Sequence, residues 1–295
     1  MPDSPLKTKI LNDEEKLIAI ERLRANQMGI ENDVWKWEHC KEAFLDLKTY
    51  LWAAMMFPIS IPSGGISTFG PLIVKSFGYD KFATILFNIP FGAVQLVATM
   101  GGAWVATKIH RKSPVLAFLS VPPIVGCVML LALPRGASHR GPLLVAYYLI
   151  SVYPGITPLV YSWSAANTAG ETKKKVTTGA LFMAQCAGNV VGPTLYTTEE
   201  APLYRRGLIS NLVLFIVLVG LYGINWFYLI FLNKRHAKRR EALGKQANRI
   251  DTSMKKVKAR TEAEDDKQEV EEVEGEDRSL NDATDFENED FVYVY

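Results

Sequence analysis

Six long stretches of the chain are apolar and contain no Asp, Glu, Lys or Arg. They lie at about 49–73, 82–107, 114–133, 141–163, 176–198 and 207–232. About 20 mostly apolar residues suffice for a helix to cross a bilayer, and a charge at the centre of such a helix costs at least about 2.5 kcal/mol. Six charge-free stretches joined by short charged loops therefore predict an all-α membrane protein with six spanning helices.

The two flanking segments are highly charged. Residues 1–48 lack the early apolar core of a signal peptide, and we expect them to form a cytoplasmic segment against the membrane, with Trp35 and Trp37 at the interface. The tail, residues 233–295, is first basic and then acidic. Its basic part can follow the anionic inner leaflet, whereas residues 262–290 have too few large apolar side chains to offset the entropy of ordering and are predicted to be disordered.

Orientation follows from the positive charges in the loops. The loops after the second and fourth spans and the segment after the sixth carry eleven of them: Lys108, Arg111, Lys112, Lys173, Lys174, Lys175, Lys234, Arg235, Lys238, Arg239 and Arg240. The remaining loops carry six: Lys75, Lys81, Arg135, Arg140, Arg205 and Arg206. Because short cytoplasmic loops are enriched in Lys and Arg, the pattern predicts that both termini are cytoplasmic.

Composition changes this picture little. The 295 residues have a net charge of +2 and a hydrophobic fraction of 48%, averages that hide the contrast between the spans and the ends. The three cysteines, Cys40, Cys127 and Cys186, are too far apart in sequence to suggest a disulfide framework or a zinc site. No phosphate-binding loop, nucleophile elbow or metalloprotease motif occurs. We therefore expect no enzyme activity, catalytic residue, metal or cofactor, and no nucleic acid as a partner.

Uncharged polar residues inside the spans are the candidate substrate-binding groups. A buried amide or hydroxyl in hydrocarbon needs a partner, which a water-filled solute path supplies. The candidates are Gln95, Tyr153, Gln185, Asn189, Asn88 and Ser60. The other interpretation is structural, because intramembrane amides also bond to neighbouring helices and hold a bundle together.

Proline and glycine are frequent in two of the spans. Pro58 and Pro62 precede Gly64-Gly65 in the first, and Pro154, Gly155 and Pro158 follow one another in the fourth, so we expect kinks in both. In the fifth span, Gly188 and Gly192 stand four residues apart. This spacing predicts a face where another helix backbone approaches closely.

Several runs of residues resemble one family. They are Leu11–Glu15 with Glu21–Arg24 and Asn26, Trp37 with Glu42–Asp46, Phe69–Pro71, Phe77–Tyr79, Asn88–Pro90, Trp163–Asn167 with Gly170, Thr172 and Lys173, Gly188–Asn189, Gly192–Pro193, Ala201–Tyr204 with Gly207, and Asp285–Asn288 with Phe291 and Tyr293. Nearly the whole chain resembles the C-terminal half, helices seven to twelve, of a fungal major facilitator superfamily transporter of the allantoate permease-like anion:cation symporters.

The resemblance implies a fold and a function. The fold is a six-helix half of a major facilitator superfamily bundle, with the first, second, fourth and fifth spans facing the cavity and the third and sixth facing lipid. The function is transport of a small organic anion or related solute, with protons as the coupling ion, in the plasma membrane. One position departs from the family: Thr107 stands before Lys108 where an acid is usual. The resemblance therefore does not extend to a charge-paired latch at that gate.

Our leading hypothesis is a secondary transporter half that works by alternating access and needs an N-terminal half that this sequence lacks. Six helices provide one wall of a cavity that lies between two halves. An acid for proton coupling would have to come from the other half, so we expect an incomplete or truncated product that pairs with such a half or with itself. The alternative is a non-transporting membrane scaffold or receptor that acts through its charged tail.

Overall fold

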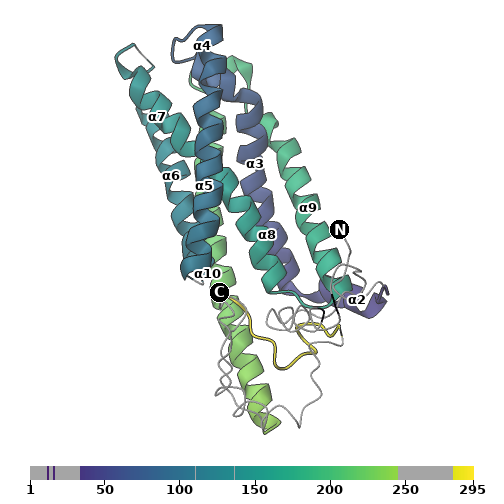
Figure 1. The fold of residues 1–295 in the computed structure, drawn as a ribbon. Helices are drawn as coiled ribbons and strands as arrows, with labels where there is room; N and C mark the ends of the chain where they lie inside the picture. Colours follow the sequence, from purple (N-terminus) through teal and green to yellow (C-terminus); the bar gives the residue numbers. More distant parts are fainter. Residues whose placement is uncertain (1–11, 13–15, 17–33, 110, 136, 245–281) are drawn as a thin grey trace. The chain divides into compact units, whose positions relative to one another are not determined.

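The computed structural model describes residues 12, 16, 34–109, 111–135, 137–244 and 282–295. Regular structure in these ranges is helical, and no strand occurs in them (Figure 1). The elements are α2 (Trp37–Leu45), α3 (Leu47–Lys75), α4 (Lys81–Leu86), α5 (Asn88–Ile109), α6 (Ser113–Ala132), η1 (Ala137–His139), α7 (Arg140–Ile150), η2 (Tyr153–Gly155), α8 (Ile156–Ala166), α9 (Glu171–Thr194), η3 (Thr198–Glu200) and α10 (Arg205–Ala242).

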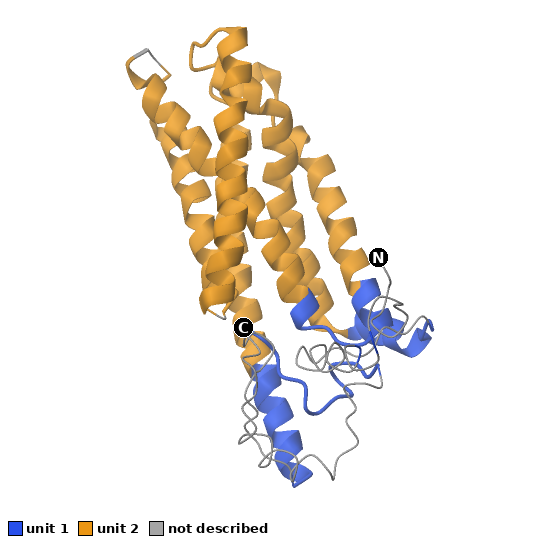
Figure 2. Ribbon diagram, in the orientation of Figure 1, with its two compact units in different colours: residues 1–45, 165–176, 231–294 blue, residues 46–164, 177–230, 295 orange. Residues whose placement is uncertain are grey.

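The chain forms two compact units (Figure 2). Unit 2 comprises residues 46–164, 177–230 and 295, and holds most of the long helices. Unit 1 comprises residues 1–45, 165–176 and 231–294, and so gathers four described segments that are far apart in the sequence. Helices α9 and α10 each contribute residues to both units.

Five of the six predicted spans are confirmed as helices long and apolar enough to cross a membrane, within the described residues. They are Leu47–Lys75, Lys81–Ile109, Ser113–Ala132, Arg140–Ala166 and Arg205–Ala242. The predicted fifth span, 176–198, corresponds to α9, which is a helix but is not among the five. Its first turns carry Lys173–Lys175 and its middle carries Gln185 and Asn189, and these residues lower its mean hydropathy. That α9 crosses the membrane stays a prediction.

Two of the spans are interrupted. The helix of the fourth span is interrupted between Ile150 and Ile156, where η2 contains Pro154 and Gly155, in the span where we expected a kink. The second span is divided at Phe87 between α4 and α5, which its sequence did not lead us to expect. By contrast, the first span forms one continuous helix, α3, through Pro58, Pro62 and Pro71.

Helices α3 and α9 approach each other at glycines. A Cβ atom added to Gly188 would lie 2.6 Å from the carbonyl oxygen of Phe57, and one added to Gly192 would lie 2.6 Å from the backbone nitrogen of Gly65. A side chain at either position would therefore force the two backbones apart. The predicted close-approach face of Gly188 and Gly192 is confirmed, and its partner is α3.

The described end of the tail departs from the predicted disorder. Residues 282–290 are placed, and Asp282, Asp285 and Asn288 are buried there, as are Phe291 and Tyr293 beyond them. The prediction of disorder is therefore wrong for residues 282–290, because their acidic groups find partners elsewhere in unit 1. The rest of the predicted disordered segment lies outside the described residues, as does most of the approach segment before residue 34.

Candidate functional site

The clearest polar pair between spans joins α8 to α9. The hydroxyl group of Tyr161 donates a hydrogen bond of 2.7 Å to Oε1 of Gln185. Both side chains are only partly buried. The Gln185 amide N–H₂ group and the Tyr161 phenol therefore belong to partly exposed side chains of unit 2. Both groups can hydrogen-bond to a polar solute.

A second polar cluster links η2 to α3. The Tyr153 hydroxyl group lies near the side chains of Ser63 and Ser67, and the Tyr153 side chain is 4% exposed. Its hydroxyl thus lies inside the bundle beside two serine hydroxyl groups. In this conformation Tyr153 supports the break in the fourth span rather than presenting its hydroxyl to a solute.

Two other candidates lie at the contact of α3 with α9. Ser60 is buried and donates to the carbonyl oxygen of Met56, 2.7 Å away on the same helix. The backbone of Asn189 lies against Gly64, where an added Cβ would come 3.0 Å from the Asn189 Cα atom. The Asn189 side chain is partly exposed one helical turn beyond Gln185, so it extends the polar face that begins there.

The remaining two candidates lie on α5. Asn88 is its first residue and Gln95 follows two turns later, and both are partly exposed. Gly155 of η2 contacts the same helix near Gln95, since a Cβ on Gly155 would lie 3.1 Å from the Ala98 carbonyl oxygen. The structure thus joins Gln185 to Tyr161 and Tyr153 to the α3 serines. No hydrogen bond joins any two of the six candidates to each other in the described part of the chain.

Sequence reasoning missed three polar residues of unit 2. Tyr161 was missed because nothing in its spacing singles it out from neighbouring aromatics. Asn225 of α10 is fully buried, and neither its amide oxygen nor its nitrogen has a hydrogen-bond partner among the described residues. The guanidinium nitrogens of Arg135 are buried without a hydrogen-bond partner in the same ranges, over the ring of Phe77 at 5.0 Å.

Arg135 lies just beyond the C-terminal end of α6. Burial lowers the pKa of its guanidinium group, because desolvation disfavours the charged form. The neighbouring Arg140 lies over the ring of Tyr79 at 5.4 Å.

Unit 2 therefore offers neutral hydrogen-bonding groups between apolar helices. The described residues contain no group of His, Cys, Asp and Glu side chains that could hold a metal ion. Apolar helices of spanning length with polar groups between them define an integral, multi-pass membrane protein.

Comparison with known proteins identifies its family. The model of the Major Facilitator Superfamily matches residues 2–193. The uncharacterized transporter C417.10 of Schizosaccharomyces pombe is 30% identical over 100% of this chain and 52% of its own length. The allantoate permease and the thiamine pathway transporter THI73 of Saccharomyces cerevisiae are 28% and 27% identical, each over 100% of this chain and 50% of their own lengths. No solved structure matches.

This chain belongs to the Major Facilitator Superfamily, a family of transporters rather than enzymes. It spans about half the length of the curated relatives it matches. The resemblance to allantoate permease-like fungal transporters and the half-bundle fold are thereby confirmed.

Proposed function

We propose that this chain is the C-terminal half of a secondary transporter that moves a small organic anion by alternating access, with protons as the coupling ion. The observation that carries the proposal is the partly exposed Tyr161–Gln185 pair between two helices of a Major Facilitator Superfamily chain. A partly exposed polar pair can exchange its internal hydrogen bond for one to a solute at little net free-energy cost. Alternating access requires that this solute bind more tightly in one of the two conformations of the transporter.

The composition of unit 1 supports six crossings with both ends on one side. Unit 1 collects residues 34–45, 165–176 and 231–242, which precede the first predicted span, join the fourth to the fifth, and follow the sixth. If these segments share one side of the membrane, the chain crosses an even number of times between them. Four crossings by α3, α4–α5, α6 and α7–α8, then two by α9 and α10, satisfy this condition. If α9 did not cross, α10 would begin on the same side as residues 165–176. Its own crossing would then put residues 231–242 on the opposite side from the rest of unit 1.

The basic residues of unit 1 support a cytoplasmic position for it. Lys173–Lys175 and the positive charges of α10 from Lys234 to Arg240 all lie in this unit. Cytoplasmic segments are enriched in such residues. We therefore propose that both termini of this half are cytoplasmic and that the host membrane is the plasma membrane.

The interior of the described spans contains no acidic side chain that could carry a proton coupled to transport. A proton-carrying acid would then be supplied by an N-terminal half, which we propose as the partner of this chain. Arg135 would attract the anion, and the Tyr161–Gln185 pair would hydrogen-bond to it within the cavity.

Uptake measurements test this function. The protein that contains this chain is produced in yeast cells lacking their own permease for the anion tested, and initial rates are measured for a set of labelled carboxylates. Gln185→Ala and Tyr161→Phe should lower uptake at low substrate concentration by roughly tenfold, the equivalent of one lost hydrogen bond of ~1.4 kcal/mol. Val190→Ala, on an exposed position of the same helix, is the control. Wild-type uptake by both site variants at equal surface abundance would contradict the assignment.

The scaffold hypothesis gains nothing specific from the structure. A scaffold acting through its charged tail needs that tail available to a partner, whereas residues 282–294 are packed against their own chain. Deleting the whole tail would also remove these contacts and disturb unit 1. Loss of a cellular role after neutralising only the acidic residues at 262–277, with uptake intact, would favour the scaffold.

A further inference from the structure

The last described segment of the chain is held like a bound peptide. Residues 282–294 form turns and irregular backbone rather than a helix, and lie within unit 1 with α2, the segment 165–176 and the end of α10 (Figure 2). Phe291, Tyr293 and Val294 are 2%, 1% and 5% exposed. A short segment this deeply buried and without regular structure must obtain its hydrogen bonds from the surrounding elements.

Two asparagine side chains bind its backbone. Asn233 of α10 accepts from the N–H of Tyr293 and donates to its carbonyl oxygen, both at 2.8 Å. Asn167 does the same for Val294, at 2.8 Å and 2.9 Å. Each amide thus pairs with the N–H and C=O of one residue, as a neighbouring strand would. Backbone pairing of this kind is how extended peptides gain affinity, while side-chain pockets give specificity.

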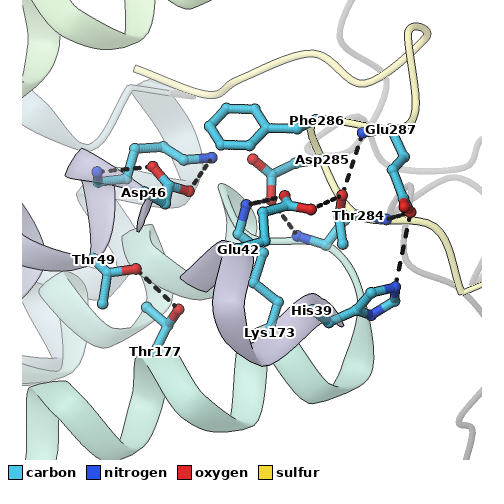
Figure 3. Close-up of polar contacts among 12 residues, drawn as sticks. His39, Glu42, Asp46, Thr49, Lys173, Thr177, Thr284, Asp285, Phe286 and Glu287 are labelled. Carbon is cyan, nitrogen blue, oxygen red and sulfur yellow. Dashed lines mark hydrogen bonds and ion pairs between the residues drawn. The ribbon is translucent and has the colours of Figure 1, made fainter. Parts of the chain in front are cut away.

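A buried lysine recognises one carboxylate of the segment (Figure 3). Nζ of Lys173 lies 2.8 Å from Oδ1 of Asp285 and 2.8 Å from Oε1 of Glu42, and both Lys173 and Asp285 have fully buried side chains. The ring of Phe286 covers the ammonium group at 4.1 Å. The Tyr293 hydroxyl donates to Oδ2 of Asp285 at 3.0 Å, so both carboxylate oxygens are bonded.

A second carboxylate anchors the start of the segment. Oδ1 of Asp282 accepts from the backbone N–H of Glu171, the first residue of α9, at 2.7 Å. Oδ2 of Asp282 pairs with Nζ of Lys36 at 2.8 Å. A carboxylate is stabilised at a helix N-terminus, where backbone N–H groups are unpaired.

The segment and its site also fit closely in shape. Gly170, with φ at +84°, lies between His39 and Thr284, where an added Cβ would come 3.2 Å from each side chain. Thr284 in turn donates to Oε2 of Glu42 at 2.9 Å. A residue of α2, a residue before α9 and a residue of the C-terminal segment therefore meet at one point, where only glycine fits without strain.

We propose that unit 1 is a peptide-binding site whose ligand is the chain's own residues 282–294, an acidic segment that ends in Phe-Val-Tyr-Val. The docked ligand contacts α2, the segment 165–176 and the end of α10, and so holds these segments together in unit 1. The site recognises one peptide without regular structure, by its backbone at two consecutive residues and by two carboxylates and three aromatic rings. This proposal rests on contacts within unit 1 and stands apart from the transport function.

The first test supplies the ligand from outside. In the intact chain, Asp285→Ala with Tyr293→Ala weakens the chain's own segment, and a fluorescent synthetic peptide of residues 282–295 is added to the protein in lipid nanodiscs. Fluorescence anisotropy should show saturable binding to this double variant and at least roughly tenfold weaker binding to the wild-type chain, whose site is occupied. A scrambled peptide of the same charge should not bind. Equal binding of the scrambled peptide, or equal binding to both chains, would reduce the effect to attraction between acidic and basic segments and overturn the proposal.

The second test needs no added peptide and stays informative if the double variant fails to fold. Hydrogen exchange of the C-terminal fragment is followed by mass spectrometry in the intact wild-type chain, Asn167→Ala, Asn233→Ala and Lys238→Ala. The two asparagine variants should exchange this fragment at least roughly tenfold faster, since each loses a pair of backbone hydrogen bonds. Lys238 is exposed on the same helix and serves as the control. Fast exchange in the wild-type chain, or the same rate in all four proteins, would overturn the proposal.

Discussion

Replacing Gly192 by alanine tests the contact on which unit 2 depends. The added Cβ would lie 2.6 Å from the Gly65 backbone nitrogen and 3.1 Å from the Gly64 carbonyl carbon. Ordinary contact begins at 3.4 Å, so the approach to the Gly65 nitrogen falls 0.8 Å short of it, and the carbonyl oxygen of Ile61 would lie closer still. Because the atoms met are backbone, helices α3 and α9 must separate rather than repack a side chain. Overpacking of this kind costs about 1–3 kcal/mol.

The same helix offers a matched control. Gly179 of α9 has nothing within 4 Å of an added Cβ. Both substitutions gain about 1 kcal/mol or less from the better helix propensity of alanine, so their difference isolates the steric cost. At 2–4 °C per kcal/mol, Gly192→Ala should melt about 2–12 °C below Gly179→Ala.

The assay is thermal unfolding in nanodiscs, followed by near-ultraviolet circular dichroism. The signal includes the Trp52–Trp163 pair, whose ring centroids are 5.0 Å apart within unit 2. Equal melting temperatures for the two variants would mean that α9 does not lie on α3 at Gly192. The arrangement of the polar groups on α8 and α9 would then have to be abandoned as well.

Three further predictions concern unit 1 and the end of α6. Lys173→Met should destabilise unit 1 by about 3–5 kcal/mol, because it leaves Asp285 buried without its cation, and proteolysis of the C-terminal segment should accelerate; unchanged cleavage would contradict the ion pair. Gly170→Ala should cost about 1–2 kcal/mol, measured by the same proteolysis, since alanine is strained at a φ of +84°. Arg135→Gln should raise the uptake KM for anions and leave that for neutral solutes unchanged; an equal effect on both would exclude electrostatic attraction.

Hydropathy was enough to predict most of the spans, because bilayer thickness and the cost of charge act on each segment separately. The interruption near Pro154 and Gly155 could be predicted from local sequence as well, because proline removes a helix hydrogen bond. The helix α9 is the exception: its Lys, Gln and Asn side chains lower the same hydropathy on which such a prediction depends. The grouping of distant segments in unit 1 adds a second reason for it to cross, beside the absence of charge from residues 176–198.

The docked C-terminal segment could not be predicted from composition. Its acidic residues look solvated in sequence, but Asp285 pairs with Lys173 and Asp282 pairs with Lys36, more than a hundred residues away. One local signal was available. Thr284 and Glu287 exchange side-chain to backbone hydrogen bonds at 3.0 Å and 3.2 Å, in the Thr-x-x-Glu pattern of a capping box.

In the candidate site, too, single residues could be predicted from the sequence, but their contacts could not. Gln185 was found because an amide in a span is conspicuous, whereas its partner Tyr161 is 24 residues earlier and depends on how α8 packs on α9. Tyr153 was found too, but its position beside serines of α3 gives it a structural contact that sequence spacing does not reveal.

A counterflow assay tests the central claim most directly. The protein carrying these residues is purified through an affinity tag, reconstituted into liposomes loaded with one unlabelled organic anion, and exposed to the same labelled anion. The account predicts saturable accumulation for at least one carboxylate, reduced roughly tenfold by Gln185→Ala. Lack of accumulation for every anion tested, with the yeast allantoate permease active in parallel liposomes, would contradict it.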